Sequence, residues 1–343
     1  MELPKALNDA VLKESEPNKF AGNDVVKGYD FNNGLDWNSV FESYRTMGIQ
    51  STNLSKSIDL VNKMIRWRGE QNQKCTIFLG YTSNMVSCGV REIIRFLCQH
   101  KMVDVIVTTT GAIEEDIIKC RDPSFIGNFR MDDKQLREDG INRIGNMLVP
   151  NGNYCHFEDW INPILDEMLE RQNKHGANWT PSKTIDLFGE RINNPESIYY
   201  WCHKNKIPVY CPAFTDGSIG DMIYFRSFKK PGLRIDLVED IRGLNNSAFD
   251  AVRSGAIILG GGVIKHHILN ANLMRNGLDY TVIINTAIEY DASDAGASPN
   301  EALSWGKIQP EGEFVKVFSE ASLVFPILVG MTFAKAHFEA KKQ

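Results

Sequence analysis

The sequence lacks both a basic surplus and a long apolar segment. Its 343 residues include 38 Lys and Arg against 43 Asp and Glu, which gives a formal net charge of -5 at pH 7. A nucleic-acid or anionic-membrane partner would require a basic surface. Eighteen consecutive apolar residues, the signature of a membrane span, do not occur. We therefore expect no nucleic acid and no membrane as partner, and we favour small cations or basic protein segments.

Paired cysteines and a secretory leader are also missing. The seven cysteines are odd in number and scattered, with no Cys-x-x-Cys pair, which is typical of free thiols in a reducing compartment. The first residues, Met1-Glu2-Leu3-Pro4-Lys5, do not have the basic and then apolar order of a signal peptide. These features predict a cytoplasmic protein.

From Cys75 onward, short apolar β-prone runs alternate with amphipathic helical patterns, which is typical of a parallel sheet with crossover helices. The expected strands are 75–79, 103–109, 208–211, 256–259, 280–286 and 315–318. The expected helices are 86–99, 157–172, 195–204, 220–228, 265–274 and 323–337. No repeat, low-complexity tract or Pro/Gly/Ser linker divides them. We predict one α/β domain over 31–343, preceded by an arm over 1–30 with a short helix.

Three loops follow expected strands and precede expected helices. They are Gly80-Tyr81-Thr82-Ser83-Asn84, Thr109-Thr110-Gly111-Ala112-Ile113-Glu114-Glu115 and Gly260-Gly261-Gly262. Such loops offer backbone N–H groups to phosphate oxygens, although the glycine turn is not the G-x-G-x-x-G fingerprint. Ligands bind beyond the carboxyl ends of parallel strands, so we predict a phosphate-bearing cofactor there, with Thr286-Ala287 lining the same crevice. Ordinary N-capped turns and a bare tight turn are the alternatives.

Acidic residues gather at or near the expected strand ends. They are Asp216, Asp221, Asp291, Asp294 and Glu301. Taken singly they fit helix caps and solvated turns, but together they predict a negative well suited to the separated ammonium groups of a polyamine. Trp305 would add an aromatic face for a cation.

His266 and Lys307 are the candidates for chemistry. His266 shares a helical face with Asn270, whereas the adjacent His267 points about a hundred degrees away; a structural histidine is equally open, and no metal site is expected, because no third ligand has a recognisable spacing. Lys307 follows an acidic stretch and has apolar neighbours. A lone lysine is usually a surface residue, but a desolvated one can attack an imine or carbonyl carbon.

Several segments carry a family resemblance. They are Gly80 to Asn84, Asn142-Arg143-Ile144-Gly145-Asn146, Asn193-Asn194-Pro195-Glu196-Ser197, Thr215-Asp216-Gly217-Ser218, Gly260 to His267, Asn270 to Gly277 and Ser304-Trp305-Gly306-Lys307. In this order, from about Gly28 to Ala336, the chain resembles the deoxyhypusine synthases. The resemblance implies Rossmann-like, doubly wound subunits with a mostly parallel sheet and helices on both faces. It also implies a homotetramer, a dimer of dimers, with active sites at the interface within each tight dimer.

The resemblance implies NAD-dependent transfer of the aminobutyl group of spermidine to a lysine of the translation initiation factor 5A precursor. Lys307 matches the imine-forming lysine, and we expect His266 to act as the proton acceptor. The residues matching the polyamine pocket are Glu115, Asp221, His266, Asn270, Ser293, Asp294, Glu301 and Trp305. The residues matching the cofactor site are Ser83, Asn84, Ser87, Thr109, Gly111, Glu114, Asp216, Gly261, Gly262, Thr286, Ala287, Asp291, Glu320, Ala321 and Ser322.

Two positions depart from the family pattern: Ala292 stands where glycine is expected, and Glu320 stands where aspartate is expected. The N-terminal arm can cover a neighbour's active-site entrance in this family, and Leu7 to Lys13 is the candidate segment here. Two alternatives stay open. One is a homospermidine synthase, which uses putrescine as acceptor, and the other is a non-catalytic NAD-binding partner of a paralogue.

Overall fold

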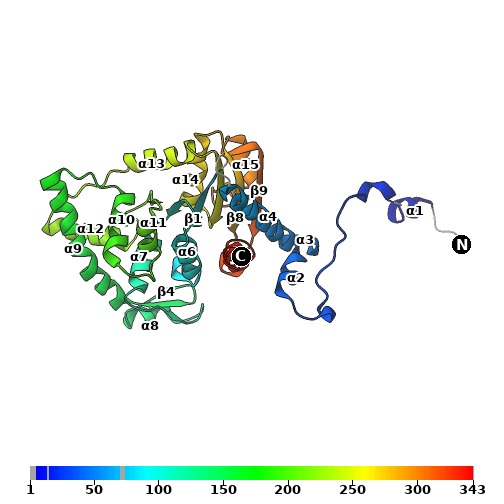
Figure 1. Cartoon of the computed structure of the whole chain (residues 1–343). Coiled ribbons are helices and arrows are strands. Elements are labelled where there is room, and N and C mark those ends of the chain that lie inside the picture. The colour runs from blue at the N-terminus through cyan, green and yellow to red at the C-terminus, as the bar shows by residue number, and fades with distance from the viewer. Residues whose placement is uncertain (1–4, 14, 70–73, 343) are drawn as a thin grey trace.

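A six-stranded parallel sheet forms the centre of the computed structural model, which describes residues 5–13, 15–69 and 74–342 (Figure 1). Its strands are β1 (Cys75–Tyr81), β2 (Val105–Thr108), β6 (Val209–Tyr210), β7 (Arg253–Leu259), β8 (Leu278–Asn285) and β9 (Ile308–Phe318). Each of the six expected strands is present, with different end points. All neighbouring strands are parallel, so the predicted fold class is confirmed.

The strand order β6-β2-β1-β7-β8-β9 reverses direction once. From β1 the chain builds outward through β2 to β6, and it then returns to β7 and builds through β8 to β9. This order is that of the Rossmann fold, whose ligand crevice lies where the order reverses. The reversal falls between β1 and β7, which pair from Cys75 and Arg253 to Tyr81 and Leu259.

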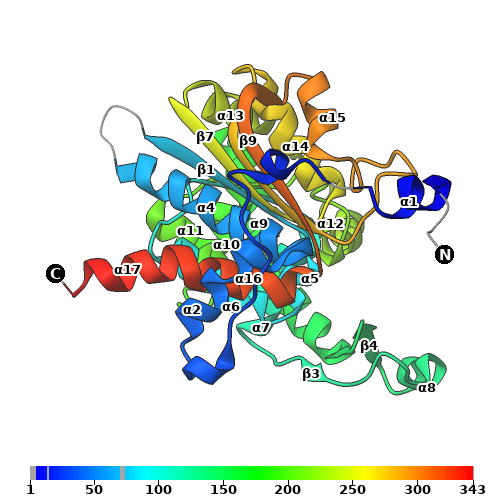
Figure 2. The same cartoon turned by 90° about the vertical axis from the view of Figure 1, so that its right-hand side faces the viewer.

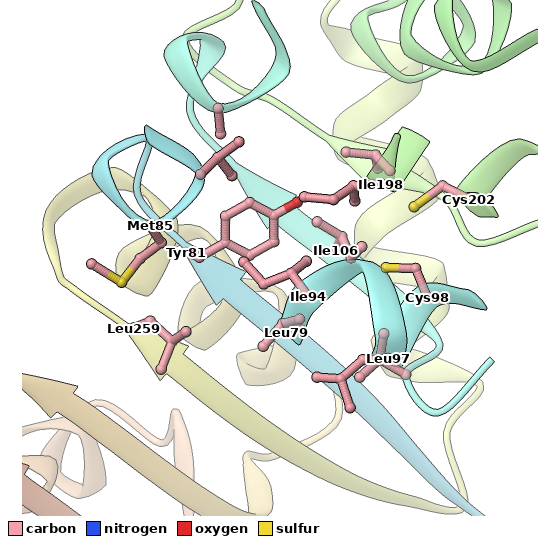
Figure 3. Close-up of a cluster of buried hydrophobic side chains, with 14 of the residues drawn as sticks. Leu79, Tyr81, Met85, Ile94, Leu97, Cys98, Ile106, Ile198, Cys202 and Leu259 are labelled. Atoms are coloured by element: carbon pink, nitrogen blue, oxygen red, sulfur yellow. The ribbon is translucent and has the colours of Figure 1, made fainter. Parts of the chain in front are cut away.

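Helices cover both faces of the sheet because strand side chains alternate between two buried clusters (Figures 1 and 2). Tyr81, on the first face, lies among Ile94, Ile106 and Ile198 in Figure 3, and Phe78 points to the second face. The helices of the first face include α4 (Ile49–Gly69), α6 (Val90–Gln99), α7 (Thr110–Lys119), α9 (Asn151–His175), α10 (Pro181–Ile192), α11 (Ile198–Asn205), α12 (Ser218–Lys229) and α16 (Ala321–Val329). The helices of the second face are α13 (Val238–Phe249), α14 (Gly262–Leu273) and α15 (Pro299–Ser304).

Two of the expected helices differ from the observed ones, one by an interruption and one by a later start. The expected helix 86–99 is interrupted at Cys88 and Gly89, which separate α5 (Asn84–Ser87) from α6. The expected helix 195–204 begins only at Ile198, because the Ser197 hydroxyl accepts hydrogen bonds from the N–H groups of Tyr199 and Tyr200 at 3.1 Å and so forms the N-cap.

A small antiparallel sheet was not expected. It has the order β3-β5-β4, with β3 at Phe125–Ile126, β4 at Ile141–Ile144 and β5 at Met147–Pro150, and it projects from the body together with α8 (Asp133–Glu138) (Figure 2). The motif around Arg143 builds this projection. Its guanidinium pairs with Asp133 at 2.6 Å and donates to the backbone oxygen of Gly145 at 2.8 Å.

The C-terminal helix continues from α16 through a π-helical turn, η3 (Gly330–Ala334), into α17 (Lys335–Ala340). By length and composition, Ala321–Ala340 is a candidate membrane span within the described part of the chain. A core helix passes the same test, and Phe325, Leu328 and Phe333 of this run are buried in the main core. Its packing against α4 and α6 accounts for its apolar side.

The N-terminal arm stands away from the body in Figure 1. It contains α1 (Lys5–Val11) and η1 (Pro17–Phe20), and it leads through η2 (Phe31–Asn33) into α2 (Trp37–Glu42) and α3 (Tyr44–Met47). Leu7, Val11 and Leu12 are exposed. Residues 1–4 and 14 of the expected arm lie outside the described residues.

Candidate active site

The residues predicted to hold a cofactor follow the carboxyl ends of the parallel strands. Ser83, Asn84 and Ser87 follow β1; Thr109, Gly111 and Glu114 follow β2; Asp216 follows β6; Gly261 and Gly262 follow β7; Thr286, Ala287 and Asp291 follow β8; Glu320, Ala321 and Ser322 follow β9. Because parallel strands end at the same edge of the sheet, all these residues belong to one edge.

The glycine turn after β7 lies against two neighbouring segments. A Cβ atom on Gly260, whose φ is +103°, would lie 2.8 Å from the Thr82 hydroxyl, and one on Gly261 would lie 2.6 Å from the Cα of Ala295. The Asn285 side chain donates to the backbone oxygens of Gly260 at 2.9 Å and Ala295 at 3.2 Å. The glycines therefore permit close approach between backbone segments at the point where the strand order reverses.

Two helices at this edge offer backbone N–H groups. The hydroxyl of Thr109, the N-cap of α7, accepts the Ser83 N–H at 3.0 Å instead of capping the helix, and the N-cap of α14 is Gly261. No described side chain caps either helix. Unpaired N–H groups at helix N-termini attract anions. The edge therefore has donors for a dinucleotide pyrophosphate.

Glu114 ties α7 to the start of α12. Its carboxylate accepts the Ile219 N–H at 2.8 Å, and the side chain is 6% exposed. A Cβ on Gly217 would lie 2.9 Å from this carboxylate, so a side chain at the residue preceding α12 would displace it. Burial raises the pKa of Glu114 to about 7.

Glu114→Gln is expected to flatten the pH dependence of stability. The carboxyl pKa is 4.5 when solvated and about 7 in the folded chain, so the folded state holds a proton that the unfolded state releases between these values. This group therefore lowers the free energy of unfolding as pH rises through that window, by up to about 3 kcal/mol. Urea unfolding at pH 5 and pH 7.5 measures the difference. Exposed Glu138→Gln is the control, and parallel curves for wild type and Glu114→Gln would contradict the expectation.

A cavity of about 230 Å³ contains Lys307 and lies between α14, α15 and the loop after β8. Five of the predicted residues line it, namely His266, Asp294, Glu301, Trp305 and Lys307. Lys307 precedes β9, and its backbone oxygen accepts the N–H of Leu278, the first residue of β8, at 3.0 Å. Its backbone therefore lies at the amino ends of these strands, whereas the cavity that its side chain lines extends to Ala292 and Asp294 of the loop after β8. Glu301 lies in the first turn of α15 and lines the same cavity as Asp294 of the loop after β8.

The end of α15 fixes where the chain turns toward Lys307. Gly306 has a φ of +69° and donates its N–H to Leu303 at 2.9 Å, while Lys307 donates its N–H to Ala302 at 2.9 Å. This is the Schellman pattern, which needs a left-handed residue where Gly306 stands. The Lys307 Nζ lies 5.6 Å from the centre of the Trp305 ring. The Trp-Gly-Lys sequence is thus a helix end that holds an amine beside an aromatic face.

His266 and Asp294 form a polar pair on the cavity wall. The His266 Nδ1 lies 3.2 Å from Asp294 Oδ1, and the His266 side chain is 52% exposed. Asp294 Oδ2 is buried without a partner in the described part of the chain, so this oxygen can accept a hydrogen bond from a cationic ligand. Asn270 and Ser293, which were predicted for the same pocket, are exposed and do not line the cavity.

Two lysines that the sequence analysis did not select brace the loop after β8. Lys265 lines the cavity, is 1% exposed, and donates to the backbone oxygens of Asp294 and Ala297. Lys316 of β9 donates to Ala287 at 2.8 Å and Gly296 at 2.9 Å. Burial lowers the pKa of both ammonium groups. The only feature of the sequence that could have indicated a buried Lys265 is its position within an apolar helix.

The two departures from the family pattern have local explanations. Ala292 has a φ of +57°, a left-handed conformation that glycine adopts more readily than alanine. Glu320 is the N-cap of α16, where its carboxylate accepts the Ser322 N–H at 3.0 Å. An aspartate commonly serves this purpose, and here the longer side chain also makes the bond.

The remaining polyamine residues, Glu115 and Asp221, do not line the Lys307 cavity. They lie on α7 and α12, which pack on the first face of the sheet, whereas α14 and α15 cover the second face. Glu115 accepts a hydrogen bond from the Tyr154 hydroxyl at 3.0 Å, its other oxygen is buried without a described partner, and burial raises its pKa. The acids predicted for one ligand are therefore divided between two faces of one chain.

No group of three or more His, Cys, Asp and Glu side chains within residues 5–13, 15–69 and 74–342 could hold a metal ion. The strand order, the uncapped helix starts and the acidic cavity define a Rossmann-like α/β protein with a ligand-binding edge and an amine-bearing pocket.

Comparison with known proteins places this α/β chain in a family. A family model described as deoxyhypusine synthase matches residues 39–332. A Drosophila melanogaster protein named "Probable deoxyhypusine synthase" is 57% identical over 358 residues, with 99% of this chain and 97% of that protein covered. The deoxyhypusine synthase of Saccharomyces cerevisiae is 50% identical over 374 residues, with 97% and 96% covered.

A solved structure from Entamoeba histolytica, described as a "putative deoxyhypusine synthase", superposes with a TM-score of 0.68 at 38% identity, and 90% of this chain and 97% of that chain are covered. The chain belongs to the deoxyhypusine synthase family and is an enzyme.

Proposed function

We propose that this enzyme transfers the aminobutyl group of spermidine to a lysine of the translation initiation factor 5A precursor, with NAD as cofactor, and so forms deoxyhypusine. The observation that carries the proposal is the cavity in which Lys307 meets Trp305, Asp294 and Glu301. An amine nucleophile, an aromatic face and two carboxylates suit a polyamine that must become covalently attached.

The NAD site is proposed at the carboxyl edge of the sheet. The uncapped starts of α7 and α14 would hold the pyrophosphate, and the predicted residues of the edge loops would surround the rest of the molecule. Bound there, NAD would supply the hydride acceptor for the carbon beside the secondary amine of spermidine and, once reduced, the hydride donor for the final imine. His266, paired with Asp294 at 3.2 Å, would take the proton from that amine.

Lys307 is proposed to carry the aminobutyl group. Its neutral amine attacks the imine carbon of dehydrogenated spermidine, a new C–N double bond forms, and 1,3-diaminopropane leaves. The lysine of the factor 5A precursor then displaces Lys307 by the same exchange, and hydride return converts the resulting imine to a secondary amine. Trp305, 5.6 Å from the Lys307 Nζ, keeps the amine on the cavity side.

A second copy of the chain is proposed to complete each site, within a homotetramer built as a dimer of dimers. The support is the division of the acids, because Glu115 and Asp221 lie on the other face of the sheet from the Lys307 cavity. Exposed apolar side chains on α12 (Tyr224, Phe225 and Phe228) and the exposed Trp305 suit burial at an interface. The projecting arm, with exposed Leu7, Val11 and Leu12, would cover the neighbour's entrance.

The test is intact mass spectrometry of purified factor 5A precursor after incubation with the enzyme, NAD and spermidine. The mass gain of one aminobutyl group is expected, together with release of 1,3-diaminopropane. No gain on the precursor would contradict the proposal. In that case, product formation with putrescine would identify a homospermidine synthase, and activity only after addition of a paralogue would identify a dependent subunit.

A further inference from the structure

Three consecutive acids on α7 are buried, and the proposed function uses only two of them. Glu114 belongs to the cofactor set and Glu115 to the polyamine set, whereas Asp116, fully buried, has no part in either. Consecutive residues of a helix point about 100° apart. The three carboxylates therefore face three different partners, and the rotation of α7 about its axis decides where each one points.

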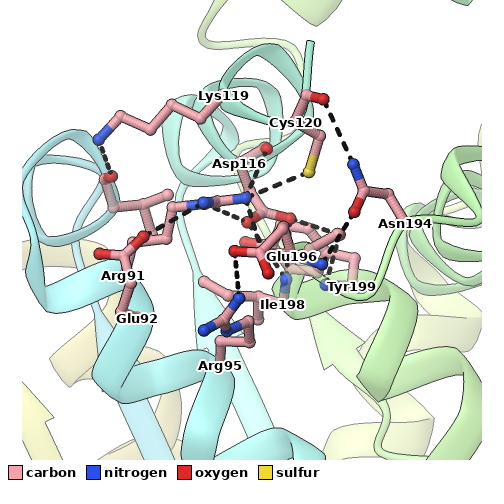
Figure 4. A network of polar contacts seen from close by, with 12 residues as sticks. Arg91, Glu92, Arg95, Asp116, Lys119, Cys120, Asn194, Glu196, Ile198 and Tyr199 are labelled. Carbon is pink, nitrogen blue, oxygen red and sulfur yellow. Dashed lines mark hydrogen bonds and ion pairs between the residues drawn. The ribbon is translucent and has the colours of Figure 1, made fainter. Parts of the chain in front are cut away.

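Asp116 is the most firmly held of the three (Figure 4). Its Oδ1 lies 2.7 Å from Arg91 Nε, and its Oδ2 accepts hydrogen bonds from the Ser197 hydroxyl at 2.6 Å and the Ile198 N–H at 3.0 Å. Arg91 is 4% exposed, so this is a buried charge pair with further donors. Such geometry is expensive to break, because either charge left alone would lack solvent.

The same contacts give a role to a motif that the proposed function leaves without one. Arg91 also donates to the backbone oxygen of Glu196 at 2.8 Å, and the Asn194 side chain donates to the backbone oxygen of Cys120, the C-cap of α7, at 3.3 Å. The segment Asn194–Ile198 therefore holds α7 by the Asp116 side chain and by the end of the helix, as Figure 4 shows.

We propose that Arg91, Asp116 and Asn194–Ile198 form a latch that fixes the rotation of α7, and that these are positioning residues for the cofactor and polyamine groups on that helix. The inference rests on the proposed function. A rotation of about 30° would move a side-chain tip at the helix surface by roughly 3 Å. That displacement is enough to separate Glu114 from the Ile219 N–H, now at 2.8 Å, and Glu115 from the Tyr154 hydroxyl, now at 3.0 Å.

The latch also reaches Asp221. Glu114 accepts an N–H of the first turn of α12, and Asp221 lies in that turn. One buried network thus fixes the positions of three acids. It positions Glu114 and Glu115 through α7, and it positions Asp221 through the start of α12. A change at Ser197 should weaken the binding of both cofactor and spermidine, although Ser197 is buried and its hydroxyl bonds to Asp116, Tyr199 and Tyr200, which belong to neither set of predicted ligand residues.

Ser197→Ala tests the latch with the least risk to folding. It removes the hydrogen bond to Asp116 and the two N-cap bonds of α11, while Arg91 and the Ile198 N–H keep the carboxylate paired. Ser57→Ala is the control for loss of a buried hydroxyl, since Ser57 is also fully buried and its hydroxyl donates one hydrogen bond, to the backbone oxygen of Asn53 at 2.9 Å on α4. Ser197→Thr keeps the hydroxyl and serves as the rescue variant. Full-length enzyme is used throughout.

The measurements are thermal midpoint, amide hydrogen exchange over residues 110–119, NAD affinity by calorimetry, and KM for NAD and spermidine. We expect Ser197→Ala to lose more thermal stability than Ser57→Ala, because it also removes the N-cap of α11. Only Ser197→Ala should exchange faster in α7 and bind NAD and spermidine about 3- to 10-fold more weakly. Ser197→Thr should restore the ligand constants.

Ligand constants of Ser197→Ala equal to those of Ser57→Ala would overturn the latch while leaving the proposed function intact. Failure of the wild-type enzyme to bind NAD would instead overturn the proposed function, and with it the positioning role. The two failures are distinguishable because the first is seen only in the variant and the second in the wild type.

Discussion

Lys307→Arg is expected to abolish aminobutyl transfer while NAD affinity stays within about twofold of wild type. Arginine keeps the positive charge and can still lie against Trp305, whose ring centre is 5.6 Å from the Lys307 Nζ. A guanidinium stays protonated and cannot form an imine. The substitution therefore removes the covalent step and leaves the cavity charge unchanged. Intact mass spectrometry of the factor 5A precursor measures transfer, and calorimetry measures NAD affinity.

Reductive trapping adds a direct view of the intermediate. With NAD and spermidine present, cyanoborohydride should fix an aminobutyl group on Lys307 of the wild-type enzyme and none on Lys307→Arg or Lys307→Ala. The control is Lys63→Arg, because Lys63 pairs with Glu313 of β9 at the protein surface and faces no predicted ligand residue. Normal transfer by Lys307→Arg would remove this lysine from the nucleophile role.

The sheet could be predicted from sequence because buried parallel strands leave a strong signal. Runs such as Ala256 to Leu259 are apolar throughout and stand between helical patterns, and all six were found. The small sheet was missed for the opposite reason. Phe125 and Ile126 of β3 are exposed, and β4 is only half-buried, so neither strand has the alternation of a half-buried strand packed on a core.

The site could be predicted in part. The rule that ligands bind beyond the carboxyl ends of parallel strands selected the edge loops that we propose for the cofactor, and Glu301, on α15, lines the same cavity as Asp294 of the loop after β8. Lys265 was missed because a charged residue on a helix usually reads as exposed, whereas here two backbone oxygens hold its ammonium group inside. The division of the acids between two faces could not be predicted, since it depends on which helix crosses to which side of the sheet.

Because the predicted polyamine acids lie on two faces of one chain, we expect two inactive variants to restore activity when they assemble together. Lys307→Ala lacks the nucleophile, and the double variant Glu115→Gln/Asp221→Asn lacks the two carboxylates of the other face. Each homo-oligomer should be nearly inactive, because one lacks the amine that forms the imine and the other lacks two carboxylates for the ammonium groups of spermidine, a loss of about 2–5 kcal/mol of binding. If a second copy completes each site, a mixed dimer contains one intact site and one doubly altered site. Random co-assembly should therefore restore about one quarter of the wild-type rate.

Co-expression with two affinity tags and tandem purification isolates the mixed oligomer, and the precursor mass assay measures its activity. The matched control joins Lys307→Ala with Trp305→Ala, since both side chains line the same cavity of one chain. A mixed dimer of these two variants has one site without Lys307 and one site without Trp305. If Trp305 is needed for transfer, neither site is intact. Activity should then stay at the level of the separate variants. Equal activity in the two mixtures would mean that each chain builds its site alone, and it would contradict the shared site.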